Sequence, residues 1–185
     1  MPYFPLFVNL EGKRVVVVGG GRVASRKVEK LLPFKPRIRV IAPEVTPYLQ
    51  NLWEKGEVEL FRRKLRMEDL RDAFLVVVAV DSLGLQRKIH RYCLRKGIHC
   101  NAVDSPDFCT FLFPALIVRK ELVVGISTSG KAPALSAGIR EFLESKMPED
   151  VDKFLTELEN MRKSLPRGKK RQKTLSSLVR RRLGL

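Results

Sequence analysis

The sequence predicts an α/β fold, with a doubly wound parallel sheet followed by a small α+β section and a helical C-terminal part. Residues 15–18 and 74–80 are uninterrupted apolar runs, which are typical of strands buried on both faces of a parallel sheet. Stretches with helical spacing of apolar residues alternate with such strand-like runs, an order that produces right-handed βαβ units. The 185 residues suffice for one domain of ordinary size with an appendage.

The expected elements alternate regularly up to residue 103. Strands are expected at 13–21, 38–43, 58–63, 74–80 and 98–103. Helices are expected at 23–32, 46–55 and 83–96, with a short helical turn at 67–70. Pro33 ends the first helix because proline cannot continue it.

The alternation stops after residue 104. Residues 111–128 predict two strands joined at 119–121, an antiparallel hairpin. A helix is expected from Pro133 until Pro148 breaks it, and residues 149–164 form another amphipathic stretch. We therefore expect a Rossmann-type dinucleotide-binding domain at 1–113, a dimerisation section of hairpin plus helix at 114–147, and a helical, basic domain or tail at 148–185.

Composition narrows the class of protein. The N-terminus lacks the basic and apolar regions of a signal peptide, and no stretch approaches the roughly 18 apolar residues of a membrane span. The expectation is a soluble, cytoplasmic protein without membrane contact. The three cysteines form no CxxC pair, and neither His90 nor His99 has partners at ligand spacing, so no metal site is expected.

The net charge of +16 is concentrated near the C-terminus. Residues 161–185 contain ten Lys and Arg and no acid. Such a segment suits nucleic acid, an anionic membrane or an acidic small molecule, or is simply a solvated helix. Because residues 161–185 contain no aromatic residue and no helix-turn-helix signature, nucleic acid is disfavoured.

A glycine-rich turn follows the first strand. Residues 19–24, GGGRVA, have GxGxxA spacing between a strand and a helix. Gly19 permits the tight turn, Gly21 lets the backbone approach a pyrophosphate, and Ala24 allows close helix–strand packing. The pattern predicts a dinucleotide site; the alternative is a strand-to-helix turn without a ligand.

An acid after the second strand selects the form of the dinucleotide. Glu44 is the nearest acid that could hold the ribose hydroxyls, although Pro43 stiffens the link. This favours NAD, whereas Arg22 and Arg26 would suit the 2′-phosphate of NADP.

Two carboxylates follow predicted strands. Asp104 lies in NAVD (101–104), past a strand end and near Phe108 and Phe111; apolar surroundings would raise its pKa and suit it as a general base. The alternative is a turn-capping role. Asp81 follows the strand 74–80 and either lines the nicotinamide pocket or caps the next helix.

Four segments in one uninterrupted order resemble a known family. They are FPLFVNLEGKRVVVVGGGRVASRKVEKLL (4–32), AVD (79–81), NAVD followed by FLFPA (101–104, 111–115) and ISTSGKAPALS (126–136). Together they resemble the precorrin-2 dehydrogenase family, the dehydrogenase and ferrochelatase module of siroheme synthesis, over about residues 3–160. No fused methyltransferase domain is recognisable, so the stand-alone form is expected.

The resemblance implies an activity and a site. The activity is NAD-dependent oxidation of precorrin-2 to sirohydrochlorin, with Fe²⁺ insertion as a further reaction, in a homodimer. Asp104 matches the family's key carboxylate, and substrate contacts are expected at Asn101, Ser127 and Thr128. Cofactor contacts are expected at Gly19, Gly20, Gly21, Arg22, Val23, Pro43, Glu44, Val80 and Asp81. The sequence departs from the family at Val80, where Thr is frequent, and at Thr128, where Ser is common.

Two other hypotheses stay open at this point. One is an NAD-sensing binding module that uses its basic tail on nucleic acid. The other is a chelatase that uses the same pocket without redox chemistry.

Overall fold

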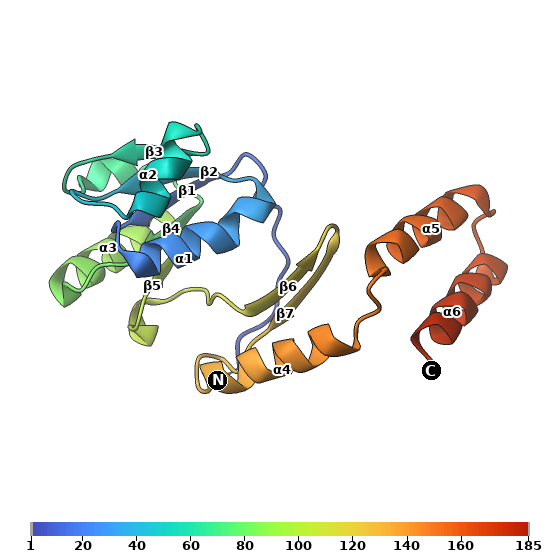
Figure 1. Ribbon diagram of the computed structural model, residues 1–185. Helices are drawn as coiled ribbons and strands as arrows, with labels where there is room; N and C mark the ends of the chain where they lie inside the picture. The colour runs from blue at the N-terminus through green and yellow to red at the C-terminus, as the bar shows by residue number, and fades with distance from the viewer. Residues whose placement is uncertain (1, 185) are drawn as a thin grey trace. The chain divides into compact units, whose positions relative to one another are not determined.

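The computed structural model describes residues 2–184 and divides into two compact units, Tyr3–Leu112 and residues 113 onward. The first unit contains a five-stranded parallel sheet, in the order β3-β2-β1-β4-β5. Its strands are β1 (Arg14–Val18), β2 (Arg37–Ile41), β3 (Val58–Phe61), β4 (Leu75–Val78) and β5 (His99–Ala102). The predicted doubly wound fold is confirmed (Figure 1).

Helices connect the strands of this sheet. α1 (Arg22–Leu31) follows β1, α2 (Pro47–Glu54) follows β2, and α3 (Leu83–Lys96) follows β4. Short 3₁₀ turns occupy Leu32–Phe34, Met67–Leu70 and Pro106–Phe108. The predicted helical turn at 67–70 is therefore a 3₁₀ turn, and the Asp69 carboxylate accepts the Arg66 N–H at 2.8 Å.

The core of the first unit lies on both faces of the central strands. Val15, Val16 and Val17 are fully buried, and neighbours along a strand point to opposite faces. Val16 and Val18 pack with Ile89 and Cys93 of α3. The continuous valine run is therefore explained by burial on both faces, as its pattern predicts.

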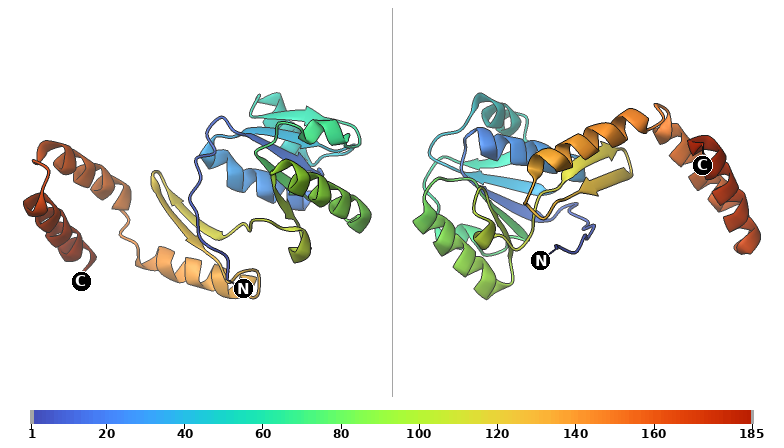
Figure 2. Two further views of the ribbon diagram at one scale, coloured as in Figure 1. Left: turned by 180° about the vertical axis from the view of Figure 1, so that it is seen from behind. Right: turned by 90° about the horizontal axis from the view of Figure 1, so that it is seen from below.

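The second unit contains a hairpin and three helices. β6 (Ala115–Arg119) and β7 (Leu122–Ile126) are antiparallel, and α4 (Pro133–Lys146) packs along them (Figure 2). The predicted strand at 111–119 begins only at Ala115, because Pro114 has no N–H to donate to a ladder. α5 (Val151–Ser164) and α6 (Lys169–Leu183) lie side by side.

None of the helices within residues 2–184 combines the length and the apolar character that are needed to cross a bilayer.

Candidate active site at the carboxyl edge of the sheet

The glycine turn is held in place by two neighbouring loops. Gly19 donates its N–H to the carbonyl of Ile41 at 3.0 Å, and Ala79 donates to the carbonyl of Val18 at 2.8 Å. Gly19 has a φ of +117°, and a Cβ there would lie 2.1 Å from the Ala79 carbonyl oxygen. Only glycine fits this position, so β1, β2 and β4 converge at its backbone.

Gly20 faces the loop after β2. A Cβ on Gly20 would lie 2.0 Å from the carbonyl oxygen of Glu44, and the Gly20 carbonyl accepts the N–H of Thr46 at 2.9 Å. The Thr46 hydroxyl contacts that of Ser25 at 2.7 Å and caps α2. The glycine turn and the Pro43–Glu44 loop are thus brought together.

Gly21 differs from its two neighbours because it faces open space. A Cβ there would meet no atom within 4 Å. Gly21 is the N-cap of α1, and no side chain caps the helix. Backbone N–H groups at such a helix start bind anions, so the space beside Gly21 fits a pyrophosphate. Arg22 and Val23 are exposed at this start, and Ala24 is fully buried, as close packing of helix and strand requires.

The loop after β5 presents Asp104. Asp104 is exposed and has a φ of +59°, a left-handed conformation that Asp and Asn tolerate best after glycine. Val103 donates its N–H to the Val78 carbonyl at 2.9 Å, which ties this loop to β4. Asp104 therefore lies at the edge of the sheet that carries the glycine turn, since all five strands are parallel.

Lys27 of α1 interacts electrostatically with this loop, and sequence reasoning missed this interaction. Burial lowers the pKa of Lys27, and Lys30 lowers it further, whereas the Asp104 carboxylate acts to raise it. A cationic side chain therefore lies within electrostatic range of Asp104. The sequence did contain a signal for this role, because Lys27 lies in the second turn of the helix that starts at the dinucleotide-binding motif.

Gln86 of α3 joins two loops of the site, and it was also missed. This side chain is only 4% exposed. Its Nε2 donates to the Val80 carbonyl at 2.7 Å, and its Oε1 accepts the Ser105 hydroxyl at 2.6 Å. One buried amide thus fixes the backbone beside Asp81 to the residue after Asp104.

Asn101 is turned inward, away from the solvent. It is 5% exposed, and its Nδ2 donates to the Phe111 carbonyl at 3.0 Å and to Cys109 Sγ at 3.5 Å. Its Oδ1 is buried without a hydrogen-bond partner among the described residues. These contacts hold the segment that returns past Asp104; a direct contact with substrate stays a prediction.

Cys109 completes this inner layer as a neutral thiol. Burial raises its pKa, and its S–H donates to the Ala102 carbonyl at 3.2 Å. Within residues 2–184, no three His, Cys, Asp or Glu side chains come together as metal ligands.

Asp81 does not cap α3, so that alternative is wrong. Ser82 is the N-cap, and its hydroxyl accepts the N–H of Leu85 at 3.3 Å. The serine oxygen is one residue closer to the helix, so it reaches the first turn. Asp81 is left exposed at the end of β4.

Ser127 and Thr128 lie in the second unit, apart from the other predicted residues in sequence. Ser127 Oγ accepts the N–H of Ser129 at 3.0 Å. Thr128 Oγ1 accepts the N–H of Ala132 at 3.0 Å and the hydroxyl of buried Ser136 at 3.2 Å. Both side chains order the turn before α4.

Three comparisons with known proteins show what this chain is similar to. The family described as "Putative NAD(P)-binding" matches residues 6–115. Siroheme synthase 1 of Serratia proteamaculans is 38% identical over 151 residues, which are 82% of this chain and 32% of that protein. Siroheme synthase of Pseudomonas entomophila is 40% identical over 148 residues, again 32% of its length. The chain thus spans about a third of the length of the curated relatives that it matches.

A solved structure covers nearly the whole chain. SirC, a precorrin-2 dehydrogenase, superposes with a TM-score of 0.75 and 27% identity, over 96% of this chain and 89% of that one. The predicted resemblance to the precorrin-2 dehydrogenase family is confirmed, and so is a nicotinamide dinucleotide as cofactor. The chain belongs to the NAD(P)-binding family whose profile spans residues 6–115.

Proposed function

We propose that this protein is an NAD-dependent dehydrogenase that oxidises precorrin-2 to sirohydrochlorin in siroheme biosynthesis. One observation carries the proposal: an exposed carboxylate, Asp104, at the same sheet edge as an uncapped helix start beside open space at Gly21. Acid–base and dinucleotide chemistry then share one site. The likeness to SirC along 96% of the chain supports the same substrate.

NAD rather than NADP is the proposed cofactor. The first turn of α1 would hold the pyrophosphate, and Glu44, exposed after β2, would accept the ribose hydroxyls. A carboxylate there repels a 2′-phosphate. Val80 and Asp81, at the end of β4, would face the nicotinamide.

The residues of this chain remove the proton that the oxidation releases from the substrate. Oxidation removes a hydride and a proton from the tetrapyrrole, and bound NAD⁺ supplies the hydride acceptor. Asp104 takes the proton at its carboxylate, and Lys27 lies within electrostatic range of that carboxylate. Gln86 holds the loops on either side at fixed separation, which keeps acceptor and base aligned.

Iron insertion is a second proposed reaction of the same site, with Fe²⁺ as substrate. The support is that the curated relatives are named siroheme synthases and that siroheme contains iron. Asp104 would remove the pyrrole protons that the metal replaces.

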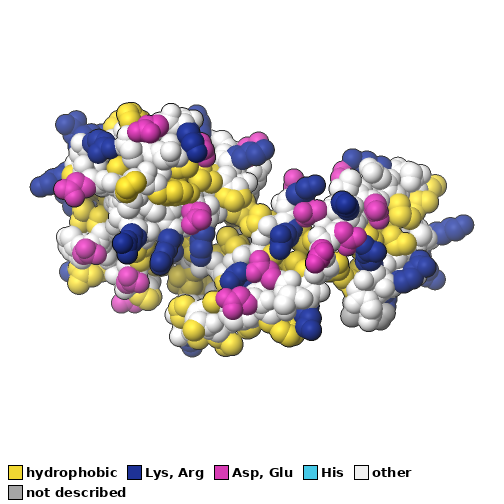
Figure 3. Space-filling model, viewed as in Figure 1, with side chains coloured by type: hydrophobic (Ala, Val, Ile, Leu, Met, Phe, Trp, Pro, Cys, Tyr) yellow, Lys and Arg dark blue, Asp and Glu magenta, His cyan; other side chains and the backbone are white. Residues whose placement is uncertain are grey.

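We also propose a homodimer built on the second unit. On α4, Leu135, Ile139 and Phe142 are 57%, 38% and 61% exposed, and their spacing places them on one face. Apolar atoms are visible over α4 in Figure 3. An exposed apolar row of this kind is typical of a subunit interface.

An anaerobic assay tests the proposal. Purified protein with precorrin-2 and NAD⁺ is expected to form NADH and the sirohydrochlorin spectrum, with a higher kcat/KM than for NADP⁺. A separate reaction with sirohydrochlorin and Fe²⁺, without NAD⁺, tests the chelatase step. Absence of NADH formation would contradict the dehydrogenase.

A further inference from the structure

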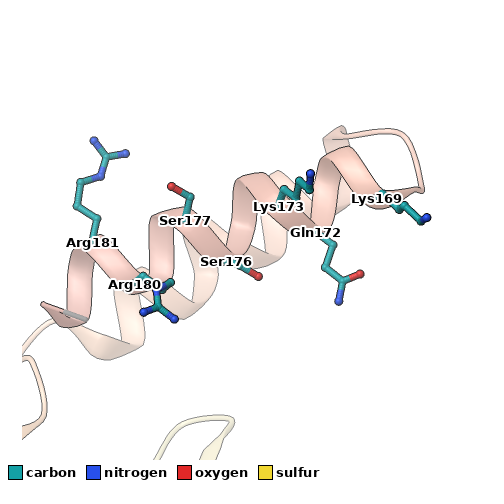
Figure 4. A pocket seen from close by; sticks show the side chains of 7 residues that line it. All are labelled: Lys169, Gln172, Lys173, Ser176, Ser177, Arg180 and Arg181. Carbon is teal, nitrogen blue, oxygen red and sulfur yellow. The ribbon is translucent and has the colours of Figure 1, made fainter.

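The basic helix α6 carries a continuous polar face. Seven exposed residues of the helix make up this face. We name this face the α6 strip; its members are Lys169, Gln172, Lys173, Ser176, Ser177, Arg180 and Arg181. Figure 4 shows two rows, Lys173–Ser177–Arg181 and Gln172–Ser176–Arg180.

The strip follows from the helical repeat. Its members recur at spacings of three and four residues, which places them on one side of an α-helix. The half-buried apolar residues of α6 lie on the other side of the helix, where it packs with α5; they are Leu175, Leu178 and Val179. The strip is therefore the face that packing leaves open to solvent.

Six of the seven cations of α6 fall into two sets, and the seventh, Lys170, is exposed and belongs to neither. Arg182 pairs with Asp150 of α5 and lies over the Phe154 ring, and Arg171 donates to the Arg162 carbonyl at 3.2 Å. These two cations stabilise the helix pair. The four cations of the strip form no ion pair within residues 2–184, and residues 161–185 contain no acid. Lys and Arg are prominent around α6 in Figure 3.

We propose that the α6 strip is a binding site for a small polycarboxylate, namely the tetrapyrrole substrate or product. This inference rests on the proposed function, because precorrin-2 and sirohydrochlorin each carry eight carboxylates. Lys169 and Lys173 lie at one end of the strip and Arg180 and Arg181 at the other, about 18 Å from first to last residue at 1.5 Å per residue. Ser176 and Ser177 lie between them. Cations at both ends with hydroxyls between match a macrocycle that carries carboxylates around its rim.

Two other ligand classes fit less well. Duplex DNA carries about one charge per 1.7 Å of its axis, whereas the central turn of the strip offers only hydroxyls, and no aromatic residue is available to stack on bases. A membrane-surface helix needs an exposed apolar face, but Leu175, Leu178 and Val179 face α5.

The test is a titration of the whole chain with uroporphyrin III, an octacarboxylate porphyrin, followed by backbone amide NMR shifts and by fluorescence. The strip variant is Lys173→Gln with Arg180→Gln. The control variant, Arg167→Gln with Lys170→Gln, removes the same charge from exposed positions outside the strip. A 20-base-pair DNA duplex is the competing probe.

The expected result is that amide shifts in α6 concentrate at 169–181. The strip variant should bind uroporphyrin III about tenfold more weakly, as two exposed charge pairs would give, and the control less than twofold more weakly. Equal losses in both variants, absent shifts in α6, or tighter binding of the duplex would each overturn the inference. NADH formation by the wild type is measured separately. If NADH forms but uroporphyrin III shifts no amide of α6, only the binding site on the α6 strip is refuted. If the amides of α6 shift but no NADH forms, only the dehydrogenase activity is refuted.

Discussion

Three consecutive glycines at the start of α1 have three different reasons to be glycine. Gly19 needs its positive φ, Gly20 needs room for the Glu44 carbonyl, and Gly21 has space that protein atoms do not use. The GxGxxA spacing predicts the first and third roles. It does not predict the second, because the loop that packs on Gly20 comes from residues 42–46.

Alanine at Gly20 and at Gly21 should therefore give opposite results. Gly20→Ala forces a Cβ against backbone and should lower the free energy of unfolding by about 1–3 kcal/mol. Gly21→Ala, at φ −79°, should leave the Tm nearly unchanged but weaken NAD binding. Thermal unfolding and NADH fluorescence titration measure the two effects; equal NAD affinity in wild type and Gly21→Ala would place the pyrophosphate elsewhere.

Replacement of Asp104 by Asn keeps a side chain that tolerates φ +59° but removes the base. We expect kcat to fall roughly 100-fold to 10 000-fold, the range of general acid–base catalysis, while the Kd for NAD changes little. Steady-state kinetics with precorrin-2 measure this. An unchanged kcat would exclude Asp104 from proton transfer.

At the scale of elements, the strands and helices of the first unit were predicted to within a few residues because their apolar periodicity reflects burial. What the sequence could not show were contacts between distant loops. Gln86 lies on an ordinary amphipathic helix, and only the fold places its amide between Val80 and Ser105. The sequence left Asp81 either as a residue of the nicotinamide pocket or as the cap of α3; the helix begins at Leu83, so Ser82 is the cap.

Gln86→Leu tests the link between the two loops. It leaves the Val80 carbonyl and the Ser105 hydroxyl without their partner, and about 1–3 kcal/mol of stability should be lost. If Gln86 positions the site, kcat should also fall about tenfold, with a larger effect than in Ser105→Ala, which keeps the bond to Val80. Loss of stability with unchanged kcat and KM would show that the amide is only structural.

The Arg63–Asp69 pair should make stability depend on pH. Arg63 donates two bonds of 2.7 Å to Asp69 and so lowers the pKa of Asp69 below its ordinary value of 3.8. Because the pKa is lower in the folded state, the pair stabilises the fold above pH 3.8 and loses this effect as the pH falls further. Wild type should have a higher free energy of unfolding than Arg63→Gln at pH 7, and urea titrations should show this difference closing toward pH 2. A gap that is constant with pH would contradict this.

At the scale of the whole molecule, the two units carry different parts of the proposed activity. The first unit contains the glycine turn and Asp104, and the second contains the exposed apolar row of α4 and the α6 strip.

The exposed apolar row of α4 predicts that Phe142→Lys weakens a homodimer, because a charge would enter the apolar interface. Light scattering after size exclusion should then give a dimer for the wild type and a monomer for the variant. A wild-type monomer would remove the proposed assembly.

The sheet edge is proposed to join dinucleotide binding to oxidation of a tetrapyrrole. The most direct measurement is the ratio of NADH to sirohydrochlorin formed from precorrin-2 and NAD⁺ without oxygen. We expect one NADH for each sirohydrochlorin in the wild type, and both products should fall together in Asp104→Asn. Sirohydrochlorin that forms without NADH, or a reaction that forms neither product, would contradict this coupling.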